Sequence, residues 1–263
     1  DMNRSITECW SHALPAARQG EVFHRHILGL YDLYERLTTA FPHVLFESCA
    51  SGGNRFDPGM LYYAPQAWTS DNSDAVERQK IQYGTSMCYP LSSMGSHVSV
   101  VPNHQVNRVT PLHTRANTAY FGTFGYELDL GKLSVEELAE VKDEIAFMKE
   151  YREIFQFGTF YRLQSPFEHN VMAWMCVSGD QKTAIVGWYR TLNRVNDRFA
   201  RVRLAGLLPD TLYEDSRSGA RCYGDELMHY GLITTDGTTG EPHPEDGLTT
   251  DFDSRLYVLK AVE

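Results

Sequence analysis

Hydrophobic and polar residues follow two alternating patterns over the first 160 positions. Stretches with apolar residues at helical spacing are separated by short apolar runs that have the length of buried strands. The stretch 21–40, for example, carries Ile27 and Leu33 on one helical face and stops before Pro42. The predicted helices cover residues 21–40, 75–87, 111–121 and 135–155, with a short one after Asp57-Pro58, and the predicted strands cover 43–47, 66–70, 94–101 and 123–130.

Strands and helices that alternate in this way build a parallel sheet. The last of these helices is the best marked, because Ser134 and Glu137 fit a capping box at its start. Four predicted strands are half the number in a closed (β/α)8 barrel, whose catalytic groups lie where the strands end. A fifth strand could end at Asp1, and the chemically interesting side chains at the strand ends are Asp1, Cys49, Asp71 and His97. We therefore predict the C-terminal half of a (β/α)8 barrel.

The pattern changes after about Gly158, where short strand-like runs separated by turn residues replace the helices. These runs cover residues 159–164, 170–177, 183–190, 200–205, 221–223 and 255–262. Because no convincing helix lies among them, they indicate an antiparallel β-sandwich. The predicted domains are accordingly 1–160, the barrel part, and 161–263, the sandwich.

Composition narrows the class of protein. Hydrophobic residues make up 42% of the 263 residues, and no apolar run has the length of a membrane helix, so we expect a soluble protein without a membrane partner. The net charge of −10 argues against nucleic acid as a partner, because no basic cluster could replace the counterions of phosphates. The five cysteines form no CxxC pair, which favours a reducing, cytoplasmic compartment.

The start of the sequence is unusual. It has no initiator Met and no signal peptide, and it opens on Asp1-Met2-Asn3-Arg4. We therefore expect a fragment that lacks the first part of its barrel.

Two carboxylates at strand ends, Asp1 and Asp71, are suited to act as nucleophile and general acid on a glycosidic bond. The residue types alone leave a second interpretation open. Asp71 and Asp74 both precede the predicted helix 75–87, and either of them could simply be its N-cap.

The other polar and aromatic groups fit structural roles better than catalytic ones. The spacing of His97, His104 and His113 fits no metal-ligand motif, so these histidines are expected to be structural, with His97 as a candidate neighbour of the site. Cys49 has no His/Asp relay in the sequence, which favours a role in lining a pocket over one as nucleophile. Tyr62, Tyr63 and Trp68 are assigned to the core or the barrel wall, with stacking on a sugar as the alternative. The remaining groups are assigned to a solvated helix face (Glu136, Glu137, Glu140, Asp143, Glu144) and to buried strand positions (Trp174, Trp188).

Several motifs in residues 1–165 resemble those of the α-galactosidases of glycoside hydrolase family 36. Asp1-Met2-Asn3-Arg4 is similar to the end of the family's nucleophile motif, residues 47–60 to its substrate loop, and residues 68–74 to its acid/base motif. The order and spacing of these motifs also fit, as do the segments 82–86 and 101–105. The substrate loop departs from the family in having fewer glycines, and the lysine that precedes the nucleophile is not in this sequence.

The resemblance implies a retaining exo-α-galactosidase that removes terminal α-1,6-linked galactose from melibiose and raffinose-type sugars by double displacement, with no metal or organic cofactor. In this scheme Asp1 is the nucleophile and Asp71 the acid/base, and Asn3, Cys49 and Gly52 bind the sugar. The resemblance also implies an oligomer, since family members are often tetramers. Two alternatives stay open. One is a transglycosylase of the raffinose-synthase kind, and the other is a catalytically silent fragment that serves in assembly or sugar binding.

Overall fold

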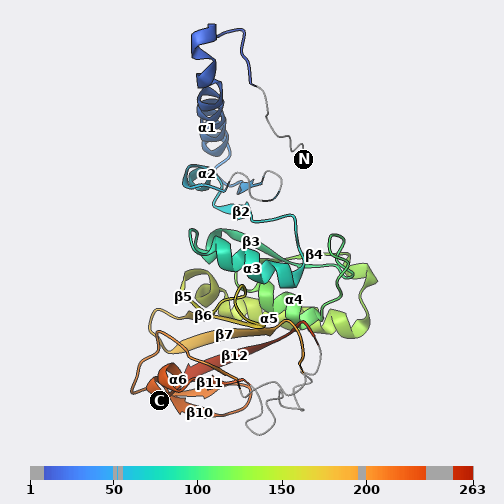
Figure 1. Cartoon of the computed structure of the whole chain (residues 1–263), viewed down its shortest axis with the longest axis vertical. Coiled ribbons are helices and arrows are strands. Elements are labelled where there is room, and N and C mark those ends of the chain that lie inside the picture. The colour runs from blue at the N-terminus through green and yellow to red at the C-terminus, as the bar shows by residue number, and fades with distance from the viewer. Residues whose placement is uncertain (1–8, 50–51, 53–55, 195–199, 235–250, 263) are drawn as a thin grey trace. The chain divides into compact units, whose positions relative to one another are not determined.

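The computed structural model of the chain describes residues 9–49, 52, 56–194, 200–234 and 251–262. The chain divides into two compact units, residues 1–71 and 72–263 (Figure 1).

The first unit contains two helices and a pair of short parallel strands. The 3-10 helix Ala16–Glu21 leads into α1 (Val22–Ala40), and β1 (Glu47–Ser48), α2 (Pro58–Tyr63) and β2 (Gln66–Trp68) follow. Helix α2 begins as the sequence predicts, with Pro58 in its first turn and the Asp57 side chain accepting a hydrogen bond of 3.0 Å from the Met60 backbone N–H. Strand β1 is shorter than predicted, because residues 43–46 form a turn and irregular backbone.

Helix α1 confirms the prediction from apolar spacing, but none of its residues is buried. Phe23, Leu28 and Leu33 are each about half exposed. Apolar periodicity therefore identified the helix without identifying what covers its apolar face.

The second unit opens with helices that alternate with parallel strands. Strands β3 and β4 pair in parallel, with Gly95 opposite Thr123. The capping box at the start of the last helix is present, since Ser134 Oγ accepts from the Glu137 N–H and the Glu137 side chain accepts from the Ser134 N–H. The elements are α3 (Ala75–Thr85), the 3-10 helix Leu91–Ser93, β3 (Met94–Ser99), α4 (Leu112–Ala119), β4 (Thr123–Glu127), the 3-10 helix Leu130–Lys132 and α5 (Val135–Phe157).

An antiparallel sheet of the order β10-β9-β12-β7-β6-β5 makes up the rest of the second unit, with a smaller pair of strands, β11 and β8. Its elements are β5 (Thr159–Gln164), β6 (Val171–Val177), β7 (Thr183–Arg190), β8 (Arg201–Val202), β9 (Leu212–Asp215), β10 (Arg221–Tyr223), α6 (Gly224–His229), β11 (Leu232–Ile233) and β12 (Asp253–Ala261). A parallel α/β part followed by an antiparallel sheet confirms the predicted fold class. The domain boundary at residues 160 and 161 stays a prediction.

The expectation of no helix after Gly158 was wrong, because α6 is a helix. Its N-cap position is held by Tyr223, whose side chain makes no capping hydrogen bond, and the helix has only six residues. Neither a capping residue nor an apolar period could therefore mark it. Strands β9 and β11 were not predicted either.

Strands β6 and β7 are buried on both faces, which explains their almost continuous apolar sequences. On one face they lie beside α4 and α5 (Figure 1). There Trp174 contacts Phe121, with ring centroids 4.9 Å apart, and Trp174 Nε1 donates to Tyr189 Oη at 3.1 Å. The opposite face belongs to a hydrophobic core whose members include Met175, Val186, Trp188, Val202, Leu204, Tyr213, Leu227, Tyr257 and Leu259. The predicted burial of Trp174 and Trp188 is confirmed.

One member of the acidic face assigned to solvent is in fact buried. Glu144 is 7% exposed, and its carboxylate accepts a hydrogen bond of 2.5 Å from Tyr126 Oη. It lies on the inner face of α5 with Val141 and Met148. Burial raises the pKa of Glu144 to about 7, against the lowering effect of the hydrogen bond from Tyr126.

All five cysteines lie within the described residues and are free thiols. Among the described residues, no helix is long and apolar enough to cross a membrane.

Candidate active site

The candidate site starts from the parallel pairing of β1 and β2. Glu47 lies opposite Gln66 and Ser48 opposite Ala67, and Gln66 Nε2 donates to Glu47 Oε1 at 2.9 Å. Because the strands are parallel and in this register, their carboxyl ends lie at the same edge. Cys49 directly follows β1 there, and Asp71 comes three residues after the end of β2. The sequence prediction that both residues follow strand ends is therefore confirmed.

Gly52 brings the loop after β1 against the backbone of Asp71. Its φ of +67° lies in the left-handed region that glycine adopts without cost. A Cβ atom at this position would lie 2.5 Å from the backbone nitrogen of Asp71 and 3.0 Å from Cα of Ser70. Both atoms belong to the backbone and cannot rotate away. Only glycine fits here, and two of the predicted site residues, Gly52 and Asp71, are in direct contact through their backbones.

The side chains at this edge differ in exposure. Ser48 is buried, Cys49 and Trp68 are half-buried, and Asp71 is exposed. The partial burial of Cys49 is compatible with its predicted role in lining a pocket, which stays a prediction. Asp1 and Asn3, the other two predicted site residues, lie outside the described residues, and their roles stay predictions.

The N-cap interpretation holds for Asp74. Its side chain accepts a hydrogen bond of 3.0 Å from the backbone N–H of Glu77, and it is 1% exposed. Asn72 supports this turn by accepting from the Asp74 backbone N–H at 3.1 Å. The helix that follows is thus capped by Asp74. The cap does not use Asp71.

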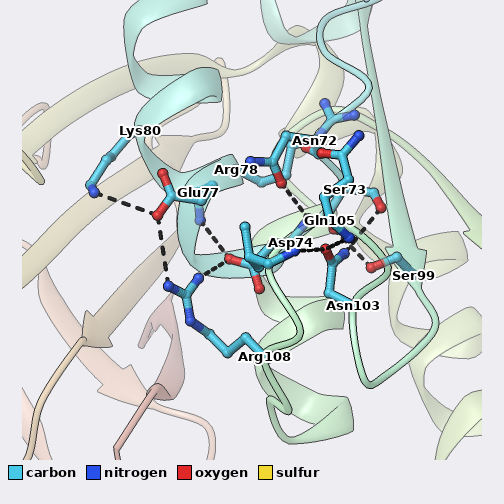
Figure 2. A network of polar contacts seen from close by, with 11 residues as sticks. Asn72, Ser73, Asp74, Glu77, Arg78, Lys80, Ser99, Asn103, Gln105 and Arg108 are labelled. Carbon is cyan, nitrogen blue, oxygen red and sulfur yellow. Dashed lines mark hydrogen bonds and ion pairs between the residues drawn. The ribbon is translucent and has the colours of Figure 1, made fainter.

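A network of polar contacts surrounds Asp74, and the sequence did not reveal it. The Arg108 guanidinium pairs with the Asp74 carboxylate and lies 3.8 Å from Glu77 Oε1, which Lys80 Nζ approaches to 3.7 Å (Figure 2). Asn103, on the same loop as Arg108, donates from Nδ2 to Ser73 Oγ at 3.3 Å. Residues 101–105 were singled out in the sequence for their resemblance alone. The contact of Asn103 with Ser73 depends on a loop that returns from 30 positions away.

Two of the three histidines considered as metal ligands lie near carboxylates. His113 Nε2 is 2.8 Å from Asp253 Oδ1, and His97 Nδ1 is 3.7 Å from Glu127 Oε2. Within the described parts of the chain, no group of three or more His, Cys, Asp or Glu side chains could hold a metal ion.

The tyrosines assigned to the barrel wall behave differently from one another. Tyr63 packs against Tyr31 and Tyr34, with ring centroids 5.7 and 5.8 Å away. Tyr62 is 78% exposed, so it does not lie in a core formed by the described residues, and its assignment to the barrel wall stays a prediction.

Comparison with known proteins gives a family match for both parts of the chain. Residues 1–158 match the family model Melibiase, and residues 171–259 match that of the glycosyl hydrolase family 36 C-terminal domain. Among curated proteins, the chain is 52% identical over 263 residues to alpha-galactosidase AgaA of Geobacillus stearothermophilus. It is 45% identical over 262 residues to alpha-galactosidase Mel36A of Lactobacillus acidophilus. Each match covers 100% of this chain and 34% of the relative, so the chain spans about a third of the relatives' length.

Solved structures of such proteins share the fold. A variant of the Geobacillus stearothermophilus enzyme AgaA in complex with raffinose superposes with a TM-score of 0.92 at 51% identity, over 99% of this chain and 35% of that one. The alpha-galactosidase from Lactobacillus brevis gives a TM-score of 0.91 at 50% identity, over 100% of this chain and 35% of that one.

Proposed function

We propose that this chain supplies the acid/base and part of the sugar pocket of a retaining exo-α-galactosidase. The premise is its family: the chain belongs to the α-galactosidases of glycoside hydrolase family 36. The observation that carries the proposal is the contact between Gly52 and the Asp71 backbone. It holds the substrate loop and the acid/base motif together at the carboxyl ends of β1 and β2. Catalytic groups of (β/α)8 enzymes are found at this edge.

The proposed reaction has two displacements. The Asp1 carboxylate attacks the anomeric carbon while protonated Asp71 donates its proton to the leaving oxygen. Asp71 then removes a proton from the water that releases galactose from Asp1. Such a mechanism requires the two carboxyl groups to lie roughly 5–5.5 Å apart. It uses only the two carboxylates and water.

The proposed substrate is a terminal α-1,6-linked galactose, as in melibiose and the raffinose family. Structures of the Geobacillus relative contain raffinose and stachyose, which supports this class of sugar. We assign Asn3 and Cys49 to contacts with the galactose ring, and we assign Gly52 to the close approach of the backbone. The cytoplasmic location and the tetramer of the full-length enzyme stay predictions from the sequence.

The test needs a protein of the relatives' length. We would replace the segment of AgaA that this chain matches by the 263 residues of the chain and refer to the product as the chimeric enzyme. The 263-residue chain alone is the companion sample. The described residues of the 263-residue chain form four parallel strands, whereas a closed barrel has eight. We therefore expect the chain alone to show negligible turnover of an aryl α-galactoside.

Azide distinguishes the two carboxylates in the chimeric enzyme. In Asp1→Gly, azide can enter in place of the nucleophile, and the product should be the β-galactosyl azide. In Asp71→Gly, azide should intercept the galactosyl enzyme and give the α-galactosyl azide. Turnover without azide should fall by several orders of magnitude in Asp1→Gly. A normal rate for Asp1→Gly, or the same anomer from both variants, would refute the assignment of roles.

A further inference from the structure

The loop between β3 and α4 returns to the N-terminus of α3 and delivers Arg108 to Asp74. Asp74 is 1% exposed and the Arg108 side chain 23% exposed, so the pair is largely removed from water. A buried carboxylate is tolerated only with a charged partner and hydrogen bonds. Asp74 has both, from Arg108 and from the Glu77 backbone N–H. Arg108 is thus the partner on which the buried Asp74 depends.

The three residues that follow Asp71 all take part in the network of polar contacts around Asp74 (Figure 2). The Asn72 carbonyl accepts from Arg78 Nε at 2.8 Å, and the Ser73 carbonyl accepts from Ser99 Oγ at 2.7 Å. Ser73 and Asp74 are buried. One peptide bond joins Asp71 to Asn72, the first residue of this framework.

Arg108 also reaches the antiparallel sheet. Its guanidinium carbon lies 5.0 Å from the centroid of the Phe252 ring, within the range of a cation–π contact. Phe252 itself has a φ of +57°, which is costly for a residue with a side chain, and its backbone N–H donates to the Thr191 carbonyl at 2.9 Å. It directly precedes β12. Phe252 thus contacts Arg108 from a left-handed backbone position.

We propose that Arg108 and Phe252 are positioning residues for proton transfer by Asp71, so that the antiparallel sheet takes part in setting the acid/base. The inference rests on the proposed function of Asp71. A purely structural role for the pair is the competing explanation. It predicts loss of stability, with the same change in rate for every substrate.

Substrates with different leaving groups separate the two explanations. A poor leaving group, as in melibiose, needs a proton from Asp71, whereas a dinitrophenolate leaves without one. In the chimeric enzyme, Arg108→Lys keeps the charge but loses the planar fork that contacts two carboxylates and stacks on a ring. We expect kcat/KM for melibiose to fall at least tenfold, while kcat/KM for the dinitrophenyl α-galactoside stays within about twofold. Phe252→Leu should show the same selectivity to a smaller degree, and it serves as the main variant if Arg108→Lys does not fold.

The matched control is Arg201→Lys, whose guanidinium carbon lies 4.3 Å from the centroid of the Tyr230 ring in the same unit. It should leave the ratio of the two kcat/KM values unchanged. Equal losses for both substrates in Arg108→Lys and Phe252→Leu, or no loss in either, would overturn the inference. Asp71→Ala, assayed in parallel, tests the proposed function separately. If Asp71→Ala spares melibiose, the proposed function fails, and if only Asp71→Ala shows the selective loss, the positioning role alone fails.

Discussion

Replacing Gly52 by alanine should damage the site through a single added methyl group. The methyl carbon would lie 2.5 Å from the Asp71 backbone nitrogen, whereas ordinary contacts begin at 3.4 Å. The difference, 3.4 − 2.5 = 0.9 Å, is the distance by which the loop or the Asp71 backbone must move. A misplacement of about 1 Å can cost a catalytic group roughly 100-fold in rate, equivalent to about 2.7 kcal/mol of transition-state stabilisation.

Stability should fall in the same variant for two reasons. Alanine in the left-handed region costs roughly 1–2 kcal/mol, partly offset by the smaller entropy of its unfolded chain, and overpacking adds about 1–3 kcal/mol. Gly219 offers a matched control, since its φ is +70° and nothing lies within 4 Å of the position of its Cβ. Gly219→Ala should therefore lose only about 1 kcal/mol of stability.

The assay is kcat/KM for melibiose and the midpoint of thermal unfolding, both measured on the chimeric enzyme. We expect Gly52→Ala to lose about two orders of magnitude in kcat/KM and Gly219→Ala to keep the parent value. Activity of Gly52→Ala within a factor of three of the parent would refute the reasoning, because it would mean that the Gly52 contact does not set the position of Asp71.

Two further predictions concern the second unit. Gly187→Ala should lower the free energy of unfolding by about 1–3 kcal/mol, because its methyl carbon would lie 2.8 Å from Trp174 Nε1 in a fully buried layer. Gly179→Ala, with open space around the added carbon, should be neutral in the same urea titration, and equal midpoints for the two variants would contradict the packing argument. Glu144→Gln should flatten the dependence of stability on pH, measured by urea unfolding from pH 4 to 8. The pKa of Glu144 is raised from 4.5 to about 7 in the folded protein, so folding takes up a proton and stability falls as the pH rises through that window. A glutamine can still accept from Tyr126, and an unchanged pH slope would show that Glu144 does not titrate in this range.

Local patterns in the sequence were sufficient for the elements with clear ends. The capping box of α5, the Asp57-Pro58 start of α2 and the apolar runs of β6 and β7 each involve neighbours within a few positions. Their physics is local, so the sequence contains it in readable form.

Features that depend on distant contacts could not be predicted in this way. Arg108 meets Asp74 across 34 positions, and nothing near either residue marks the pair. Glu144 was assigned to solvent by its charge, although Val141 and Met148 show that it lies on the buried face. Its carboxylate is accommodated by Tyr126, which comes from β4. Periodicity was the better guide than residue type at this position.

The candidate site was predicted as residue types at strand ends, and its geometry was not. Cys49 and Asp71 are at the ends of β1 and β2 as the pattern indicated. The contact between Gly52 and the Asp71 backbone, by contrast, needs a left-handed glycine and a loop that folds back, which no spacing rule describes.

The separation of the Asp1 and Asp71 carboxyl groups is the most direct test of the proposed double displacement. It can be measured in a crystal structure of the chimeric enzyme with galactose bound. The account predicts roughly 5–5.5 Å, with the anomeric carbon between the two groups. A separation of about 6.5 Å or more, or either carboxyl group turned away from the sugar, would contradict it.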